Sequence, residues 1–455
     1  MKNIINISLI KSAISYQPSA NNNIQPILDK ALKLKKLSLN EIAVLLHVED
    51  KKNLKKIYTA ASKLKEIVFG KRVVLFTPLY ISNECVNNCL YCGFRSANKS
   101  TSRITMTIPQ IIEQAKILEK TGFKRILLVA SENPKKVTIS YITSAIKAIY
   151  KNTNIRIVHL NSAPFDATKF SKLHKAGLGV YQLFQETYHP ETYFHMHPGE
   201  HEKEYYYRIT AMDRAIEGGI NDIGIGALFG LYDYKFETLS LIAHSRHLEK
   251  KFGCAAHTIS VPRLRPAEGA SVQKTKYVLN DKNFKKVIAV LRLAVPTAGI
   301  VVSTRESARL RNYIINIGAS QISAGSRTSP CGYSQNKKEL LEQFKIEDSR
   351  PLDKVIFDLA KHNTIPSLCT TCYRVGRTGH TFTKQARKGV IKNFCLPNAL
   401  LTLEEYILDY ADLQTKNICD KIVHNYLKNS KKYGLPKNFV SKLESIKNGK
   451  RDVYY

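Results

Sequence analysis

The sequence predicts an α/β fold, a closed (β/α)8 barrel of the TIM type, over residues 71–326. Short apolar runs rich in β-branched residues alternate there with amphipathic stretches. Eight such units fall within about 250 residues, which is the usual size of a (β/α)8 barrel. Polar residues also follow most of the runs, and in this architecture the C-terminal ends of the strands carry the active site. An open doubly wound sheet is the alternative, but eight repeats favour closure.

A helical segment precedes the predicted barrel and a mainly helical region follows it. Apolar residues recur at helical spacing over residues 37–69, which predicts an N-terminal helical extension. The region after the barrel breaks the strand–helix alternation and contains helical patterns over Leu352–His362 and Leu403–Leu413. The sequence therefore predicts three regions, residues 1–70, 71–326 and 327–455.

The expected barrel strands are apolar runs bounded by polar or turn-forming residues. In chain order they are Val73–Tyr80, Arg125–Ala130, Ile155–Leu160, Gly179–Phe184, Asp222–Leu228, His257–Leu264, Gly299–Ser303 and Ala319–Ala324. Helical patterns lie between them, for example over Pro109–Lys120, Glu204–Glu217 and Phe236–Lys251.

The bulk composition limits the location of the protein. Its 455 residues are 44% hydrophobic, which suffices for a large core. No uninterrupted apolar run reaches the roughly 18 residues that a membrane span needs. The N-terminus also lacks the continuous apolar region of a secretion signal. We therefore expect a cytoplasmic protein with no membrane partner.

The charge of the chain is strongly positive. The net charge of +33 arises from 70 Lys and Arg against 37 Asp and Glu, and taken alone it favours a polyanion partner. The basic residues are dispersed, however, and form no stripe interleaved with aromatic residues. A compositional bias explains this pattern as well as a binding surface does, so a nucleic-acid partner is not expected.

Three cysteines in one short stretch are the most specific chemical signal. Cys85, Cys89 and Cys92 have the spacing Cys-x3-Cys-x2-Cys, with the aromatic Tyr91 directly before the last. Three thiolates hold three irons of a four-iron cubane and leave the fourth iron open for a ligand. A zinc site usually takes four ligands from paired Cys-x2-Cys units, and nine cysteines in this chain are too sparse for a disulfide framework. The pattern therefore indicates a reactive 4Fe-4S cluster.

A second cysteine set lies near the C-terminus. Cys369, Cys372 and Cys395 have the spacing Cys-x2-Cys-x22-Cys and again supply three thiolates. A fourth protein ligand could complete a zinc site, but His362 and His380 do not give the spacing of a zinc finger. A second cluster with an open iron is the better interpretation. The other cysteines, Cys254, Cys331 and Cys419, are treated as isolated thiols.

Polar residues gather directly after the predicted strands. One such residue is usually a helix cap, but repetition around one rim of a barrel indicates a functional face. In strand order these candidates are Glu132, Asn161, Glu186, Arg263 and Arg265, Arg305, and finally Ser323 and Arg327.

Longer motifs resemble a known family. They are Tyr181–His189, Gly224–Asp233, His257–Pro266, Ser303–Ser307 and Ser323–Ser326. Together with the first cysteine set they resemble the aromatic-lyase branch of the radical S-adenosylmethionine (SAM) enzymes, over about residues 37 to 413. One group of this branch makes 2-iminoacetate for thiamine, and the other matures FeFe-hydrogenase. Only the second group carries the C-terminal cysteine set, so the resemblance favours the hydrogenase-maturing group.

The resemblance implies a fold and a reaction. The barrel is then a radical SAM barrel, followed by a cluster-binding domain. SAM binds the open iron of the first cluster, and its reductive cleavage gives a 5′-deoxyadenosyl radical. The radical takes a hydrogen from the amino group of L-tyrosine, and the Cα–Cβ bond breaks to give p-cresol and dehydroglycine. At the second cluster dehydroglycine becomes carbon monoxide and cyanide, which bind an extra iron together with free cysteine as a precursor of the hydrogenase active site.

The resemblance also implies residue roles. Glu132 matches the residue that holds the SAM amino group, and Asn161 and Glu186 match contacts to SAM or substrate. Arg305 and Arg327, helped by Ser323, are candidates to pair with the tyrosine carboxylate, because arginine offers a bidentate fork. His257 resembles a histidine that binds the extra iron, or is simply hydrogen-bonded at the start of a strand. Arg263 and Arg265 either bind SAM or buttress the barrel.

Partners and alternatives follow from the same reading. An electron donor such as a flavodoxin or a ferredoxin, and other hydrogenase maturases, are the expected protein partners. The alternative enzyme is the thiamine-pathway 2-iminoacetate synthase, which stops at dehydroglycine. The alternative of another class is an iron–sulfur or nucleic-acid-binding protein without catalysis.

Overall fold

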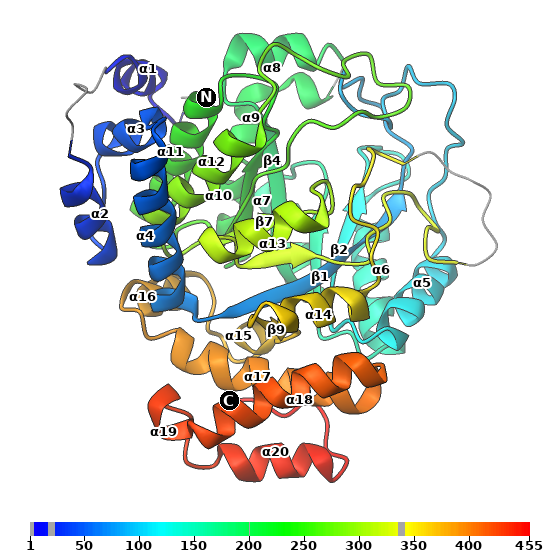
Figure 1. Ribbon diagram of the computed structural model, residues 1–455. Coiled ribbons are helices and arrows are strands. Elements are labelled where there is room, and N and C mark those ends of the chain that lie inside the picture. The colour runs from blue at the N-terminus through cyan, green and yellow to red at the C-terminus, as the bar shows by residue number, and fades with distance from the viewer. Residues whose placement is uncertain (1–3, 17–22, 200, 335–341) are drawn as a thin grey trace.

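The structure is a computed structural model that describes residues 4–16, 23–199, 201–334 and 342–455. At its centre lies a parallel sheet in which β1 pairs with both β2 and β8, so that the strands close into a barrel (Figure 1). The closed (β/α)8 barrel predicted from the sequence is therefore confirmed. The strands are Arg72–Ser82 (β1), Arg125–Ala130 (β2), Ile157–Asn161 (β3), Leu178–Glu186 (β4), Ile223–Ala227 (β5), Thr258–Ser260 (β6), Gly299–Val302 (β7), Gln321–Ser323 (β8) and Ile365–Ser367 (β9).

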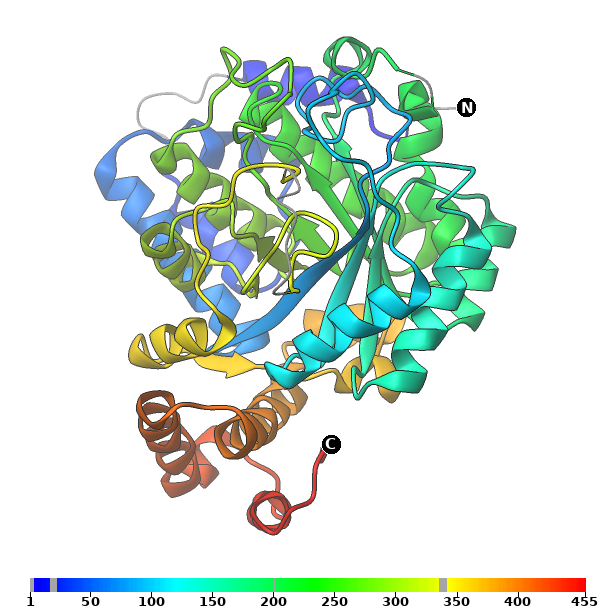
Figure 2. The same ribbon diagram turned by 90° about the vertical axis from the view of Figure 1, so that its right-hand side faces the viewer.

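The helices fall into an N-terminal group, a group around the barrel and a C-terminal group (Figures 1 and 2). The first are Ile7–Ser15 (α1), Gln25–Leu32 (α2), Leu39–His47 (α3) and Lys51–Phe69 (α4). The second are Ile108–Lys120 (α5), Ile139–Asn152 (α6), Ala167–Lys175 (α7), Pro190–Met196 (α8), Tyr205–Ile209 (α9), Ala211–Glu217 (α10), Tyr234–Phe252 (α11), Asp281–Ala294 (α12) and Ala308–Ile317 (α13), with a 3-10 turn at His201–Lys203. The third are Leu352–Lys361 (α14), Thr371–Arg374 (α15), Gly379–Arg387 (α16), Lys392–Asp409 (α17), Leu413–Lys428 (α18), Ser430–Tyr433 (α19) and Phe439–Lys447 (α20).

Side-chain caps set where many of these helices begin. A Ser, Thr, Asp or Asn before the first turn accepts a backbone N–H that has no partner within the helix. Such caps are Ser38, Thr107, Thr138, Asp166, Asn280 and Ser307. Many of the loops from strand to helix therefore end at a defined capping residue.

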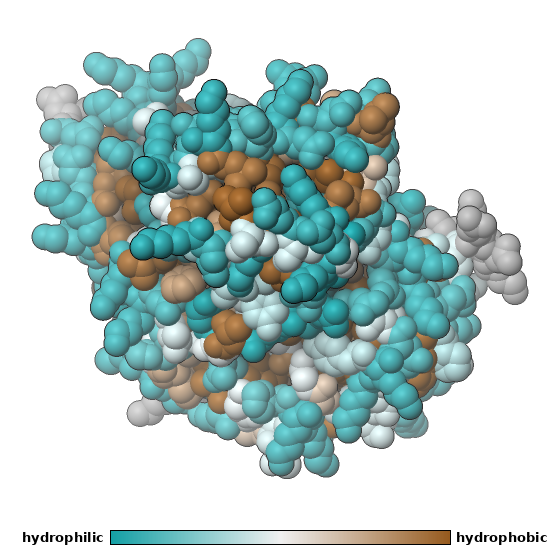
Figure 3. All heavy atoms as spheres, turned by 90° about the horizontal axis from the view of Figure 1, so that it is seen from below, coloured by the Kyte–Doolittle hydropathy of each residue, from teal (hydrophilic) through white to brown (hydrophobic). Residues whose placement is uncertain are grey.

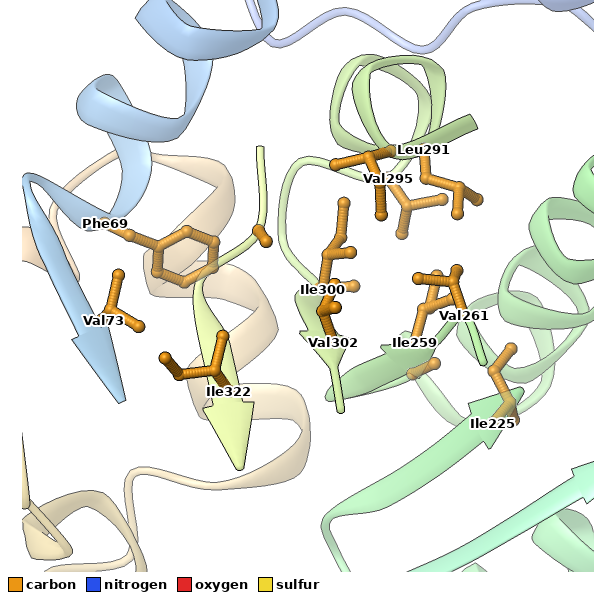
Figure 4. Close-up of a cluster of buried hydrophobic side chains, with 14 of the residues drawn as sticks. Phe69, Val73, Ile225, Ile259, Val261, Leu291, Val295, Ile300, Val302 and Ile322 are labelled. Atoms are coloured by element: carbon orange, nitrogen blue, oxygen red, sulfur yellow. The ribbon is translucent and has the colours of Figure 1, made fainter. Parts of the chain in front are cut away.

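The main core lies between the barrel wall and the helices around it. Successive side chains of a strand point to opposite faces, so one set from each strand points outward. Ile300, Val302 and Ile322 belong to this outward set. Ile300 and Val302 lie near Val295 at the end of α12, whereas Ile322 lies beside Val73 (Figure 4). The other set points into the barrel and forms the interior described below.

The ninth strand was not predicted. β9 pairs in parallel with Arg72–Val74 at the start of β1, before the stretch of β1 that pairs with β2. Its sequence, Ile365-Pro366-Ser367, gives no strand signal, because proline lacks a donor and is confined to edge positions in sheets. β9 joins the C-terminal region to the barrel sheet, at the end opposite the first cysteine loop (Figure 2).

Two other details are not part of the expected pattern. The helical stretch Glu204–Glu217 divides into α9 and α10 at Thr210, whose hydroxyl donates to the Tyr206 carbonyl (2.7 Å) and so competes with the regular helix bonds. The N-terminal extension, for which the sequence predicts helices but no position, packs against the flank of the barrel on α11, α12 and α13.

The outer surface is mainly hydrophilic. Seen from the side of α18–α20, hydrophobic residues form patches within a hydrophilic surround (Figure 3). Leu413 on α18 and Val440 on α20 are exposed apolar residues of these helices. In the described part of the chain, none of the helices has the length and apolar character needed to cross a membrane.

Candidate functional site

The first cysteine set lies on the irregular loop that follows β1, at the C-terminal end of the strand. Glu132, which follows β2, ties this loop to the barrel. Its carbonyl accepts from the Val86 N–H (2.9 Å) and its carboxylate accepts from Asn87 Nδ2 (2.7 Å). The residue expected to hold the SAM amino group therefore lies beside the cysteine loop and anchors it.

Arg103 closes this loop from the outside. Its guanidinium donates to four backbone carbonyls, those of Asn83 (2.8 Å), Phe94 (2.7 Å), Arg95 (2.6 Å) and Asn98 (2.8 Å). One side chain thus joins the two ends of the segment that carries the cysteines. Sequence reasoning missed Arg103, because it follows no strand and belongs to no motif.

We expect Arg103→Ala to lose the first cluster. The change leaves four carbonyls without their donor, and each unmet buried group costs about 1–3 kcal/mol. Iron and sulfide content after anaerobic reconstitution should fall, with the spin-resonance signal that responds to SAM lost and the second signal kept. Arg103→Lys should restore only part of the signal, because one ammonium cannot span four carbonyls. Full loading of Arg103→Ala would show that the loop needs no such clamp.

An upper cavity opens inside the barrel beneath this loop. Its volume is about 160 Å³, and Cys92 lies on its wall. Four predicted residues line it, namely Asn161, Glu186, Arg305 and Ser323. The structure therefore brings together candidates from four different strand ends, as expected of a barrel active site.

Glu186 has an unusual backbone conformation. Its φ is +66°, in the left-handed region that a side chain rarely adopts, where β4 shifts register against β5. Arg208 Nη2 lies 3.6 Å from its carboxylate, and the Leu228 N–H donates to its carbonyl (2.7 Å). Backbone strain of this kind costs about 1–3 kcal/mol and clusters at functional sites.

Arg305 is the one cationic side chain among the described residues that line the upper cavity. Its guanidinium carbon lies 3.3 Å from the centroid of the Phe344 ring, and Nη1 donates to the Arg263 carbonyl (3.4 Å). Burial lowers the pKa of Arg305, and the nearby Tyr80 and Glu186 oppose this shift. Arg327 is placed differently, since it lies outside the lining and donates to the neighbouring Ser326 carbonyl (3.1 Å).

Arg263 and Arg265 lie behind the cavity wall. The Glu306 carboxylate accepts from Arg263 Nε (2.9 Å) and from Arg265 Nη2 (2.8 Å). Arg263 also pairs with Asp281 (2.8 Å) and stacks on the Phe284 ring at 4.6 Å. Of their two predicted roles, these contacts favour buttressing of the barrel over binding of SAM.

Gln343 joins the cysteine loop to the segment that returns over the barrel mouth. Its side-chain amide donates to Cys92 Sγ (3.8 Å), and its carbonyl oxygen Oε1 accepts from the Tyr80 hydroxyl (2.7 Å). Its backbone accepts from Gly93 and donates to Thr328. Hydrogen bonds to cluster sulfur tune the potential of iron–sulfur sites. Sequence reasoning missed Gln343, because it lies far from any strand end.

The second cysteine set lines a lower cavity at the other end of the barrel, of about 40 Å³. Cys369 follows β9, Cys372 lies in α15 and Cys395 in α17. Burial, together with the nearby Cys395 and Cys369 thiols, raises the pKa of Cys372 to about 12. Burial lowers the pKa of Arg72, but the same three thiols outweigh it and raise that pKa above its usual value. The three thiols therefore line one cavity together with the buried Arg72.

His257 also lines the lower cavity, as its predicted role requires. One ring nitrogen, Nε2, lies 3.2 Å from the Tyr373 hydroxyl, and the other, Nδ1, lies 3.3 Å from Asp222 Oδ1. Arg125 donates to the Cys369 carbonyl (2.7 Å) and lies over the Tyr373 ring at 5.1 Å. The histidine is thus buried beside the cysteines, but these contacts alone account for its position.

An apolar layer lies between the two cavities. Phe76, Leu127 and Val301 form a small buried cluster inside the barrel and line the upper cavity. One inward position earlier on the same strands, Val74, Arg125 and Gly299 line the lower cavity. Both chemical centres therefore share one barrel interior.

The donor sets fit iron–sulfur clusters. None of the six cysteines is part of a disulfide, and thiolates alone are the usual ligands of such clusters. Among the described residues, no three His, Cys, Asp or Glu side chains gather closely enough to hold one metal ion. In a 4Fe-4S cubane each thiolate binds a different iron, so the three thiolates need not converge on one metal ion. The fit to such a cluster therefore rests on each set consisting of thiols alone.

Comparisons with known proteins agree with this site. The radical SAM superfamily model matches residues 79–244, and the biotin and thiamin synthesis associated domain matches residues 260–365. A crystal structure of HydG, described as a maturase of the FeFe-hydrogenase, is 44% identical, covers 100% of both chains and has a TM-score of 0.94. The chain belongs to the HydG family of radical SAM enzymes.

Other relatives are consistent with membership of the HydG family. HydG from Carboxydothermus hydrogenoformans is 37% identical, covers 97% of this chain and 98% of its own, and has a TM-score of 0.84. The 2-iminoacetate synthase of Escherichia coli K12 is 30% identical over 339 residues, which are 74% of this chain and 88% of its own. A 4Fe-4S cluster with SAM is the cofactor that the radical SAM domain implies. The expected family and the TIM-type radical SAM fold are confirmed.

Proposed function

We propose that this chain cleaves L-tyrosine to p-cresol and dehydroglycine in the upper cavity. We further propose that it converts dehydroglycine to carbon monoxide and cyanide in the lower cavity, for assembly of the FeFe-hydrogenase active site. The second cysteine set, in its own cavity, is the observation that supports this most. The two matching domain models end at residues 244 and 365, both before Cys369, whereas the likeness to HydG covers the whole chain.

The residues of the upper cavity have distinct roles in this proposal. Reductive cleavage of SAM on the first cysteine set supplies the 5′-deoxyadenosyl radical. Asn161 and Glu186 contact SAM at the cavity wall, and Glu132 holds its amino group. Arg305 and Ser323 bind the tyrosine carboxylate, which fixes the amino group toward the radical. The enclosed barrel excludes water from these steps.

The residues of the lower cavity suit an anionic fragment. Arg72 and Arg125 are buried there beside the cysteines, and they favour a carboxylate over a neutral molecule. His257 binds the extra iron, which is cargo of the reaction together with free cysteine. A second 4Fe-4S cluster on Cys369, Cys372 and Cys395 completes this centre.

The alternative function is that of the thiamine-pathway 2-iminoacetate synthase. The 30% identity with the Escherichia coli enzyme and the match to the biotin and thiamin synthesis associated domain favour it. A lyase of that type releases dehydroglycine and has no use for a second thiol-lined cavity. The lower cavity therefore favours the hydrogenase-maturing reaction.

Cys369→Ala separates the two functions. Reconstituted protein with SAM, tyrosine and a reductant should give p-cresol, carbon monoxide and cyanide. Cys369→Ala should abolish carbon monoxide while p-cresol persists, because the change removes a ligand of the lower centre alone. Cys331→Ala, which removes a half-buried thiol outside both sets, is the matched control. Formation of p-cresol without either diatomic product by the unsubstituted protein would favour the thiamine-pathway reaction.

A further inference from the structure

The three thiols of the first set open onto different spaces. Cys92 lines the upper cavity and Cys89 is buried. Cys85 is half-buried and lines a separate hollow on the outside of the loop. The cysteine loop therefore has an inner face toward the substrates and an outer face toward solvent.

The outer hollow has a volume of about 410 Å³. It lies between the cysteine loop and the loop that follows β2, and its described lining residues are Glu84, Cys85, Ser96, Asn98, Lys99, Thr101, Arg103 and Asn133. Arg103 is held by the loop carbonyls, as described above. The wall around Cys85 is therefore built from fixed polar groups, and it contains no large apolar side chain among the residues described.

Lysines lie in and beside this hollow. Lys99 is an exposed residue of its lining, and the exposed Lys135 and Lys136 closely follow the lining residue Asn133, whose side chain accepts from the Lys135 N–H. Glu84 is the one carboxylate among the described lining residues, and Lys136 Nζ neutralises it at 2.6 Å. Lys99 and Lys135 are left as positive charge at the surface, in a chain whose net charge is +33.

We propose that this hollow is the docking site of an acidic one-electron carrier protein, which delivers its electron beside Cys85. The inner face of the loop is taken by SAM and the amino-acid substrate, so the outer face is the side left for a carrier. Positive potential at the rim steers a negatively charged partner and orients it. The inference rests on the reductive chemistry of the radical SAM family, whichever product this chain makes.

The electron balance of the step is simple. The reduced carrier gives up one electron and is thereby oxidised. SAM accepts that electron, and its bond from sulfur to the 5′ carbon breaks to give methionine and the 5′-deoxyadenosyl radical. The carrier then leaves in its oxidised form, so its docking must be reversible and of moderate affinity.

A second lysine-rich groove gives a matched control. It lies between α4, α12 and α13. Its charged lining residues are Lys51, Lys55, Lys63, Lys282 and Lys285, with the carboxylates Glu49 and Glu66. No cysteine is among its described lining residues. It therefore offers similar charge without access to either cysteine set.

The test compares two charge reversals in the reconstituted protein. The variants are Lys99→Glu with Lys135→Glu at the hollow, and Lys55→Glu with Lys285→Glu at the control groove. The probe is an acidic flavodoxin. The affinity of each variant for flavodoxin is measured directly by binding. In addition, the rate of 5′-deoxyadenosine formation is measured twice, once with reduced flavodoxin and once with dithionite as the electron source. The hollow variant should bind flavodoxin at least about 10-fold more weakly, with a shallower dependence on salt, while its dithionite-driven rate is unchanged.

The opposite results would overturn the docking site. Weaker flavodoxin binding in the control variant alone would move the carrier to the α4 groove. Unchanged flavodoxin affinity in the hollow variant would also refute the proposal, even if its rates fell. Absence of dithionite-driven cleavage in the unsubstituted protein would instead contradict the radical SAM chemistry itself, and the affinity measurement would still decide the docking site.

Discussion

Arg305→Ala should raise the KM for tyrosine on the order of 100-fold, because a charge-assisted arginine fork contributes about 3 kcal/mol to binding a carboxylate. Arg305 is the sole cation among the described residues lining the upper cavity, so no neighbour can replace it. SAM cleavage in the absence of tyrosine should continue near its usual rate. The measurement is p-cresol formation against tyrosine concentration, with 5′-deoxyadenosine followed in parallel.

Two variants sharpen this result. Arg305→Lys keeps the charge but loses the planar fork and the stacking on Phe344, so it should recover only part of the affinity. Arg327→Ala is the matched control, because Arg327 lies outside the lining and bonds to a neighbouring carbonyl. If Arg327→Ala raised the KM and Arg305→Ala did not, the carboxylate would be bound at the end of β8 instead.

Asp348→Ala should lower the free energy of unfolding by about 3–5 kcal/mol, because it leaves the buried Arg311 without its counter-charge. Asp348 accepts from Arg311 and from Arg350 Nε (2.8 Å), and both Asp348 and Arg311 are about 1–3% exposed. Arg311 also donates to the Ser323 carbonyl at the end of β8. Urea unfolding followed by circular dichroism would measure the loss.

Arg350→Ala provides the comparison for this pair. The Arg350 side chain is 27% exposed, and its removal leaves Asp348 still paired with Arg311. Its effect should therefore be about 1 kcal/mol or less, as for pairs near the surface. Equal losses in Asp348→Ala and Arg350→Ala would contradict the view that burial of Arg311 sets the cost.

The barrel could be predicted because each of its strand and helix units is determined by residues that are neighbours in the sequence. The apolar runs and the helix caps after them are local patterns, and the two cysteine sets are recognised from their spacing along the chain. β9 could not be predicted, since Ile365-Pro366-Ser367 becomes a strand only by pairing with the first residues of β1, Arg72–Val74. Gln343 was missed for the same reason, because its contacts with Cys92 and Tyr80 join residues far apart in the chain.

The arginines show the same limit in the site itself. Arg263, Arg305 and Arg327 all lie at or shortly after the end of a predicted strand and look alike in the sequence. The structure distinguishes them through Glu306. This carboxylate follows Arg305 in the chain but accepts a hydrogen bond from Arg263, so Arg263 is paired away from the cavity. Residue type and position at a strand end identified the rim, but the partner of each charge decided which arginine faces the cavity.

β1 runs past both cavities and so determines the distance between the two centres. Arg72 and Val74 face the lower cavity, and Phe76, Pro78 and Tyr80 face the upper one, so every second residue of a single strand divides the interior. Inserting one residue would turn the following side chains to the other face of the wall. The separation of the two chemistries can therefore change only in steps of two residues, about 7 Å each. In a barrel with two centres, the distance between the centres can therefore take only certain values. This restricts how such a protein can diverge or be redesigned.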